Sequence, residues 1–391
     1  MGCNSSTPPK GQQGTDMSKI PSRRRLSMAT GGAPPDESKG GGTSGAAPLN
    51  RADTKRRRLS MVDGEAKSGG GGADGSPNNV AMPHEFEAIT ANAGVVKVDG
   101  LPITFSCFSR PGNDPMKRSK ENQDSMTVIP NYGSPDQMFI AVFDGHGPNG
   151  AQASQFVRSV LPQRVFCDEL ATEPFLPLRQ GCVQTNKELC ESIIDVEVSG
   201  STGIISFLRG NKLFVANVGD SRAVLGRVND NGLIRAVDLS HDQKPDRPDE
   251  KARIIAHGGR VFEWGVPRVW LRDVDMPGLA MARSFGDMAA ETVGVFAEPE
   301  LSKVTLTSNH RFVIWASDGV WEFISSQDAC NIVYKHWKQG PRKAADALVA
   351  ESVKRWNLEE DVVDDTTVII LFLNYPKGYG SSSKKKRASA T

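Results

Sequence analysis

Aromatic side chains are absent from the first 85 residues of this 391-residue chain, which hold 15 of its 39 glycines and 8 of its 24 prolines. The first aromatic residue is Phe86. So little apolar surface cannot offset a backbone ordering entropy of about 1–2 kcal/mol per residue. We therefore predict that residues 1–85 are disordered, that 86–376 fold as one domain, and that 377–391 form a disordered basic tail.

Long apolar runs are missing as well. No stretch approaches the roughly 18 apolar residues of a membrane-spanning helix, and no apolar signal-peptide core follows Met1, so we do not expect secretion. The 6 cysteines form no CxxC pair and no short metal-ligand spacing. This pattern favours reduced cytosolic thiols over a disulfide framework or a zinc site.

The formal net charge is only +1, which argues against a nucleic-acid binder with a basic folded face. We expect no nucleic-acid partner, and a monomer. The charge is divided along the chain: residues 1–85 carry 12 Lys/Arg against 8 Asp/Glu, and the remainder carries 35 against 38. The near-zero total is therefore a cancellation between a basic tail and a slightly acidic domain.

The first six residues fit the N-myristoylation pattern M-G-x-x-x-[ST], with Gly2 as acceptor and Cys3 placed for palmitoylation. One myristoyl chain binds membranes only marginally, so a second acyl group is needed for stable anchoring. The pattern is short, and an ordinary disordered terminus is the alternative. We predict a lipid-anchored protein at the cytosolic face of a membrane, with the cytoplasm as the fallback.

The motif R-R-R-L-S-M occurs twice, at 23–28 and 56–61. One hypothesis makes Ser27 and Ser60 substrates of a basophilic kinase. The other makes the arginines a polybasic supplement to the lipid anchor, worth about 1 kcal/mol each near an anionic surface. The two are compatible, because phosphate would weaken the membrane attraction. A nuclear-localisation run or a solvated stretch is the simpler alternative.

Runs rich in Val, Ile, Phe and Thr predict strands at 137–143, 202–208, 212–218, 311–317 and 366–373. Turn-like residues at 209–211 and 219–222 predict an antiparallel meander over 202–228. Apolar residues at helical spacing predict helices at 152–166 and 341–356. Strand runs mixed with longer helices indicate an α+β layered domain.

Aspartates recur at the boundaries of these strands. Asp144 and Asp318 directly follow strands, Asp220 follows one after a single Gly, and Asp364 and Asp365 directly precede one. In antiparallel strands these boundaries meet at one sheet edge, where carboxylates repel unless cations lie between them. Mg²⁺ or Mn²⁺ are the natural partners of such oxygen ligands. A turn residue or helix cap is the commoner role of any single Asp-Gly pair.

Asp144 is followed by Gly145 and His146. Gly145 allows its carbonyl to approach an ion closely, and His146 adds a titratable imidazole. Two metal ions a few ångströms apart can generate hydroxide at neutral pH and stabilise an in-line displacement at phosphorus. The residues themselves thus point to metal-assisted phosphoryl chemistry.

Eight motifs occur in an order that resembles the protein phosphatase 2C (PPM) family of metal-dependent serine/threonine phosphatases. They are 120–124 (KENQD), 142–147 (VFDGHG), 200–203 (GSTG), 216–222 (ANVGDSR), 241–246 (HDQKPD), 278–287 (GLAMARSFGD), 316–321 (ASDGVW) and 364–368 (DDTTV). The resemblance runs from about 102 to 374, and the stretch 267–270 (PRVW) looks most like plant-type and protist members. It implies a four-layer α-β-β-α sandwich of two antiparallel sheets flanked by helices.

The resemblance also implies residue roles. Asp144 would bridge two Mn²⁺ or Mg²⁺ ions, Asp318 and Asp364 would complete the first site, and the Gly145 carbonyl would serve the second. His146 would be the general acid that protonates the leaving seryl or threonyl oxygen, after direct attack by a bridging hydroxide.

Two further aspartates have secondary roles by the same resemblance. Asp124 would act through metal-bound water, and Asp220 would hold a third, weaker ion together with Asp318.

The sequence departs from the family pattern near Asp124. Animal members carry a phosphate-binding arginine where this chain has Ser119, so Arg118 or Lys120 is the candidate replacement. Asp365 stands where Asn is common and competes with Asp364 as a ligand.

The leading hypothesis is thus hydrolysis of phosphoserine and phosphothreonine in proteins. The alternatives are a catalytically weak pseudophosphatase acting as a membrane-tethered binding module, and a phosphohydrolase of small molecules. Retention of the metal and acid residues favours the enzyme.

Overall fold

The computed structural model describes residues 93–116 and 119–376. Several predicted sites lie outside these ranges: Gly2, Cys3, Ser27, Ser60 and Arg118. The predicted domain boundary at residue 85 lies outside them too.

Two antiparallel sheets form the centre of the fold. The first contains, in spatial order, β1 (Ala93–Val98), β2 (Leu101–Arg110), β16 (Thr366–Leu373), β15 (His310–Ala316), β8 (Arg222–Val228) and β9 (Ile234–Asp238). The second contains β13 (Phe285–Gly286), β5 (Gly200–Ser201), β4 (Gln137–His146), β6 (Gly203–Arg209), β7 (Lys212–Val218) and β14 (Glu300–Thr305), with β3 (Asp124–Pro130) paired to β4.

The main core lies between the two sheets and draws apolar side chains from both. Every residue of β16 is buried, which explains why this strand reads as a continuous apolar run rather than an alternating one. Trp315 of β15 donates from Nε1 to Ser206 Oγ of β6 at 2.8 Å. This bond between the sheets satisfies the one polar atom of the largest side chain in the core.

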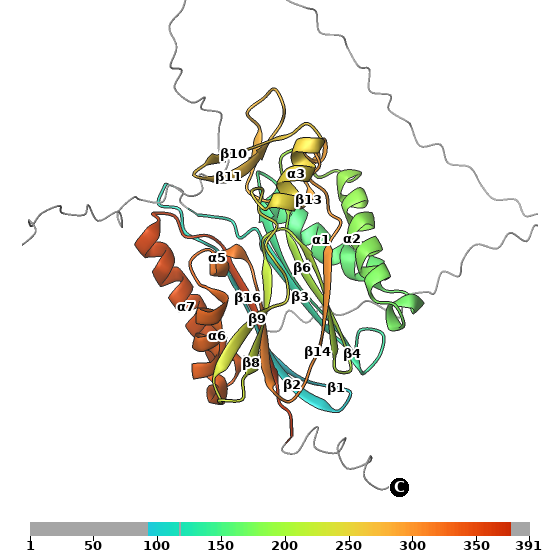
Figure 1. The fold of residues 1–391 in the computed structure, drawn as a ribbon, viewed down its shortest axis with the longest axis vertical. Coiled ribbons are helices and arrows are strands. Elements are labelled where there is room, and N and C mark those ends of the chain that lie inside the picture. The colour runs from blue at the N-terminus through green and yellow to red at the C-terminus, as the bar shows by residue number, and fades with distance from the viewer. Residues whose placement is uncertain (1–92, 117–118, 377–391) are drawn as a thin grey trace, which may run out of the picture. The chain divides into compact units, whose positions relative to one another are not determined.

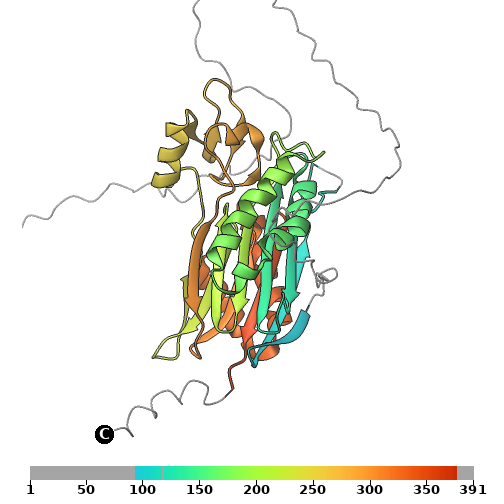
Figure 2. The same ribbon diagram turned by 90° about the vertical axis from the view of Figure 1, so that its right-hand side faces the viewer.

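Helices cover the outer face of each sheet (Figures 1 and 2). The seven-stranded sheet is covered by α1 (Gly150–Val165) and α2 (Phe175–Cys190), and the six-stranded sheet by α5 (Asp318–Trp321), α6 (Ser326–Lys335) and α7 (Pro341–Glu359). Short 3-10 turns occur at Asp168–Ala171 and Trp337–Gln339. The four-layer α-β-β-α prediction is confirmed.

A small unit sits at one end of the sandwich, at the top of Figures 1 and 2. It consists of α3 (Pro248–Ala256), α4 (Met288–Glu291) and a sheet of β10 (Arg260–Trp264), β11 (Val266–Trp270) and β12 (Pro277–Leu279). It has its own apolar cluster, which includes Ile254, Val269 and Met281.

The predicted strands and both predicted helices are confirmed, with boundaries shifted by a few residues. The meander over 202–228 is wrong in its last strand. β6 and β7 pair as a hairpin, but β8 pairs with β15 and β9 in the other sheet. Residues 219–221 therefore cross between the sheets rather than turn within one. Over the described residues, no helix combines the length and apolar character that a membrane span requires.

Candidate active site

Three carboxylates converge at the end of the sandwich. Asp144 in β4, Asp220 after β7 and Asp318 at the start of α5 each place an oxygen within 4.8 Å of the others. Asp220 and Asp318 are buried and Asp144 is half-buried. Buried like charges at this spacing are costly unless a cation lies between them, so the donor set suits a hard divalent ion.

Hydroxyl groups connect two of these aspartates. Thr202 Oγ1 accepts from the Asp144 amide at 3.1 Å and lies 2.7 Å from Ser221 Oγ, next to Asp220. Thr202 also donates its amide to the Asp144 carbonyl at 2.9 Å. Thr202 and Ser221 are fully buried. Thr202 of the GSTG motif thus connects β4 to residues 219–221, which lead from β7 to β8.

The turn that carries Asp318 is fixed from α7. The carbonyl of Gly319 accepts from Ser352 Oγ at 2.5 Å and from Trp356 Nε1 at 2.7 Å. A Cβ on Gly319 would lie 1.9 Å from the Asp365 carbonyl oxygen, so only glycine fits. The helical stripe predicted from sequence therefore positions a metal-ligand candidate.

Asp124, at the start of β3, is paired in register with Asp144. Its Oδ2 accepts from Ser317 Oγ at 2.8 Å, while Oδ1 is buried without a hydrogen-bond partner among the described residues. Burial, and next the negative charge of Asp365, raise the pKa of Asp124 to about 7. An orphaned buried carboxylate oxygen is the group that a water held by a cation would satisfy.

Asp364 and Asp365 differ in their surroundings. Asp365 accepts from the amides of Gly112 at 2.7 Å and Gln123 at 3.0 Å, and is buried. Asp364 is 24% exposed at its side chain, and its Oδ1 accepts from the Asp365 amide. Both carboxylate oxygens of Asp365 therefore accept hydrogen bonds from the backbone before β3. Of the two aspartates, Asp364 is the ligand candidate.

Lys120 lies between these two aspartates. Its Nζ is 2.8 Å from Asp364 Oδ1 and 2.8 Å from Asp365 Oδ1. Burial alone would lower the pKa of Lys120, but the two carboxylates outweigh it and hold the pKa above its usual value. In this arrangement Lys120 neutralises acidic groups. Its phosphate-binding role stays a prediction.

His146 lies beside the cluster, next in sequence to Gly145. Its Nε2 is 2.6 Å from Asp287 Oδ2. The Asp287 side chain is 1% exposed and that of His146 is 20% exposed. The local sequence around Asp287 carries no signal of this contact, because the histidine lies 141 residues away in the chain.

Lys244 is a second residue without a predicted role. It forms an ion pair with Asp220 Oδ2. Lys244 belongs to the motif HDQKPD, and its contact with Asp220 depends on how the chain returns after β9. Lys244 thus pairs with a member of the acidic cluster, whereas Lys120 pairs with Asp364, which is not among the three clustered carboxylates.

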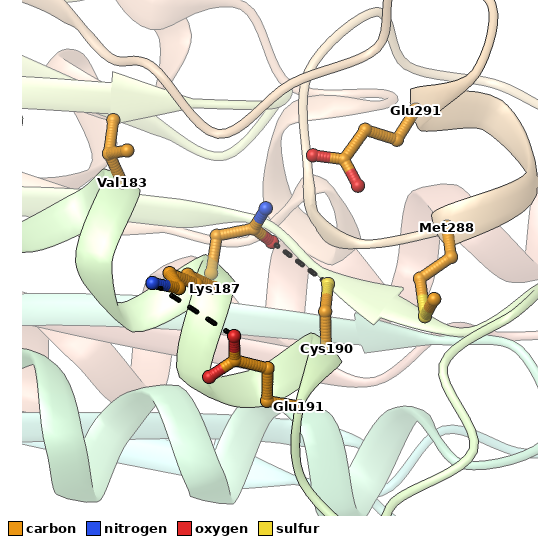
Figure 3. Close-up of a pocket in the computed structure, with 7 residues that line it drawn as sticks. Val183, Lys187, Cys190, Glu191, Met288 and Glu291 are labelled. Atoms are coloured by element: carbon orange, nitrogen blue, oxygen red, sulfur yellow. Dashed lines mark hydrogen bonds and ion pairs between the residues drawn. The ribbon is translucent and has the colours of Figure 1, made fainter.

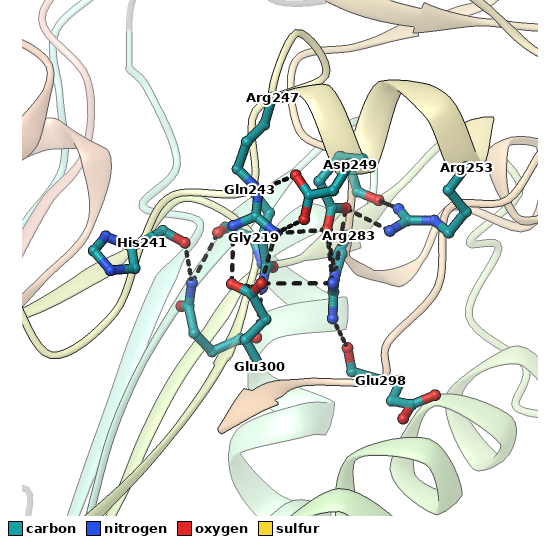
Figure 4. A network of polar contacts seen from close by, with 12 residues as sticks. Gly219, His241, Gln243, Arg247, Asp249, Arg253, Arg283, Glu298 and Glu300 are labelled. Atoms are coloured by element: carbon teal, nitrogen blue, oxygen red, sulfur yellow. Dashed lines mark hydrogen bonds and ion pairs between the residues drawn. The ribbon is translucent and has the colours of Figure 1, made fainter. Parts of the chain in front are cut away.

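A second group of carboxylates lies within 4.8 Å of one another: Asp249 and Glu250 in the first turn of α3, and Glu300 at the start of β14. Three arginines form ion pairs with this group, as Figure 4 shows: Arg247, Arg253 and Arg283. Glu250 is fully buried and already forms ion pairs with all three arginines. The network therefore stabilises the fold and is not a metal site.

A family model of protein phosphatase 2C matches residues 112–360. The chain belongs to the protein phosphatase 2C family. It is 39% identical over 293 residues to "Probable protein phosphatase 2C 35" of Arabidopsis thaliana, covering 69% of this chain and 83% of the relative. It is 37% identical over 324 residues to "Probable protein phosphatase 2C 64" of Oryza sativa subsp. japonica, covering 78% and 74%.

The solved serine-threonine phosphatase 2C of Toxoplasma gondii matches this phosphatase with a TM-score of 0.62 and 24% identity, over 72% of this chain and 99% of that one. At that identity the likeness shows the shared fold. As a protein phosphatase 2C, the protein is a protein serine/threonine phosphatase of a metal-dependent family that uses Mn²⁺ or Mg²⁺.

Proposed function

We propose that this phosphatase hydrolyses phosphoserine and phosphothreonine in proteins at the Asp144 cluster. The convergence of Asp144, Asp220 and Asp318 within 4.8 Å is the observation that carries the proposal. A non-catalytic binding module has no physical need for three such carboxylates together with a paired histidine.

We propose oxygen ligands on this chain for two Mn²⁺ or Mg²⁺ ions, and Asp220 with Asp318 for a third, weaker ion. The proposed ligands are Asp144, Asp318, Asp364 and the Gly145 carbonyl, with Asp124 acting through water. Bound there, the ions would lower the pKa of water and stabilise negative charge at phosphorus.

The reaction requires a new bond between a water oxygen and phosphorus as the bond from phosphorus to the seryl or threonyl oxygen breaks. The leaving oxygen takes the electron pair of the broken bond and needs a proton. We assign that proton to His146, the titratable side chain that directly follows the Asp144–Gly145 pair. The products are the free hydroxyl side chain and inorganic phosphate.

The test is turnover of a phosphothreonine peptide by the full chain with Mn²⁺ or Mg²⁺ and with a chelator. We expect turnover that the chelator abolishes and that Asp144→Asn reduces at least 100-fold. Absence of metal-dependent turnover, or full activity of Asp144→Asn, would contradict this mechanism and favour the pseudophosphatase. Faster hydrolysis of free nucleotides than of the peptide would instead favour a small-molecule phosphohydrolase.

We also propose that acyl groups on Gly2 and Cys3 hold the protein at the cytosolic face of a membrane. The N-terminal pattern and the neighbouring arginine runs support this. A Gly2→Ala variant that still sediments with membranes would contradict it.

Phosphorylation of Ser27 and Ser60 by a basophilic kinase would weaken that attachment by charge. The expected result is release of the acylated protein from anionic vesicles after kinase treatment. Absence of phosphate at both serines would rule the switch out.

A further inference from the structure

We infer that Asp287 is a positioning residue for His146, holding the imidazole where it meets the leaving oxygen. This inference rests on the proposed function, and it assigns a role to a residue that never touches the reacting atoms. It follows from three features: a short contact, the burial of the carboxylate, and a backbone that fixes where the carboxylate lies.

The contact joins Asp287 Oδ2 to His146 Nε2 at 2.6 Å. Ser284 Oγ donates to the same oxygen at 2.6 Å. With only 1% of its side chain exposed, Asp287 cannot exchange these partners for water. A buried carboxylate is retained only where such donors compensate its lost hydration.

The backbone around Asp287 is held from several sides. Asp287 adopts a left-handed conformation, with φ 51° and ψ 49°, and its amide donates to the Ser199 carbonyl at 2.9 Å. The preceding Gly286, also at positive φ, donates its amide to Asn186 Oδ1 of α2 at 2.8 Å. A non-glycine residue keeps a left-handed conformation only where its surroundings determine it.

Asn186 therefore links α2 to the Asp287 turn. It also lines a cavity of about 340 Å³ together with Lys187 of α2 and Met288 of α4 (Figure 3). The lining of this cavity includes none of the carboxylates of the active site, so the cavity is separate from that site.

The chemical consequence concerns the orientation of one ring. An imidazole rotates about two single bonds, and the hydrogen bond at one ring nitrogen decides its orientation and its tautomer. An aspartate that holds a catalytic histidine acts through the histidine alone. Here Asp287 holds Nε2, so Nδ1 is the nitrogen from which the proton would be donated. The loss of Asp287 should matter most where the leaving group depends on a donated proton.

The first test is Asp287→Asn, because asparagine tolerates the left-handed conformation. We expect kcat on a phosphothreonine peptide to fall at least tenfold. On p-nitrophenyl phosphate, whose leaving group needs little protonation, we expect less than a threefold fall. KM and Mn²⁺ affinity should stay within twofold. Asp346→Asn, which removes a surface carboxylate paired with Arg342, is the matched control. It should change none of these values.

The second test is a double-mutant cycle with His146→Ala. If Asp287 acts through His146, the double variant His146→Ala/Asp287→Asn is no slower than His146→Ala alone. Equal losses on both substrates, or additive losses in the cycle, would overturn the inference and give Asp287 a purely structural role.

A third readout does not depend on turnover. The ¹⁵N resonances of the His146 ring should move in Asp287→Asn and stay unchanged in Asp346→Asn. A wild-type protein without metal-dependent turnover would overturn the proposed function, whereas unchanged His146 resonances would overturn the positioning role.

Discussion

Asp124 and Asp144 occupy directly opposite positions of the antiparallel pair formed by β3 and β4. Like charges in such positions destabilise a strand pair, and Asp220 and Asp318 add further negative charge beside Asp144. These clustered carboxylates therefore favour a cation and lower the stability of the metal-free protein.

The effect of Asp144→Asn on stability should have opposite signs without and with metal. In chelator we expect the variant to melt at or above the wild-type temperature, because one of the clustered charges is gone. In Mn²⁺ the wild type should gain about 2.7 kcal/mol at a 100-fold excess over Kd, and the variant much less. Thermal unfolding of both proteins in both conditions measures this. A variant less stable than wild type in chelator would contradict the repulsion argument.

Asp364→Asn and Asp365→Asn should separate metal binding from loop anchoring. We expect Mn²⁺ affinity, measured by titration calorimetry, to fall at least tenfold in Asp364→Asn and less than threefold in Asp365→Asn. Asp365→Asn should instead lower the free energy of unfolding by about 1–3 kcal/mol, because it weakens the contacts to the Gly112 and Gln123 amides. The opposite order of affinities would make Asp365 the ligand.

Glu250→Gln should be among the most destabilising single changes in the small unit. Glu250 is buried and pairs with three guanidinium groups. Its neutralisation leaves Arg253 without a carboxylate partner among the described residues, while Arg247 and Arg283 keep Glu300. Such a loss costs about 3–5 kcal/mol. Asp249→Asn is the control: its side chain is 63% exposed, so it should cost under about 0.5 kcal/mol. Urea denaturation measures the loss of unfolding free energy in both variants. Equal losses would show that burial of Glu250 does not make its ion pairs more important than that of Asp249.

His310 should make the protein less stable in mild acid. Burial, together with Arg227 and Arg311, lowers the pKa of His310, and its Nδ1 accepts from the Thr307 amide at 3.1 Å. The unfolded chain thus binds the proton more readily, so stability falls as pH drops below about 6.5, the ordinary histidine value. The free energy of unfolding, measured in chelator from pH 7.5 to 5.5, should fall less steeply in His310→Asn. Identical slopes would assign the acid sensitivity to other groups.

The strands and the metal-ligand candidates could be predicted from local sequence. Continuous apolar runs bounded by aspartates are short-range patterns, and Asp144, Asp220 and Asp318 do converge. The predicted reason, a single sheet edge, is wrong: Asp144 lies in β4 of one sheet, Asp318 follows β15 of the other, and Asp220 lies where the chain crosses between the two sheets. The helix α7 could also be predicted from a short-range pattern, because its buried residues recur at helical spacing.

Contacts between distant segments depended on the tertiary structure. That β8 leaves the hairpin for the other sheet depends on which apolar face each strand buries, and turn residues alone do not show it. The commitment of Asp365 to Gly112 and Gln123, and the meeting of His146 with Asp287, arise only when the chain closes on itself. The sequence by itself determined which acidic and basic groups exist and which chemistry they suit. The tertiary structure alone decided the partner of each group, because the partner of a buried charge is set by register and burial rather than by its neighbours in the chain.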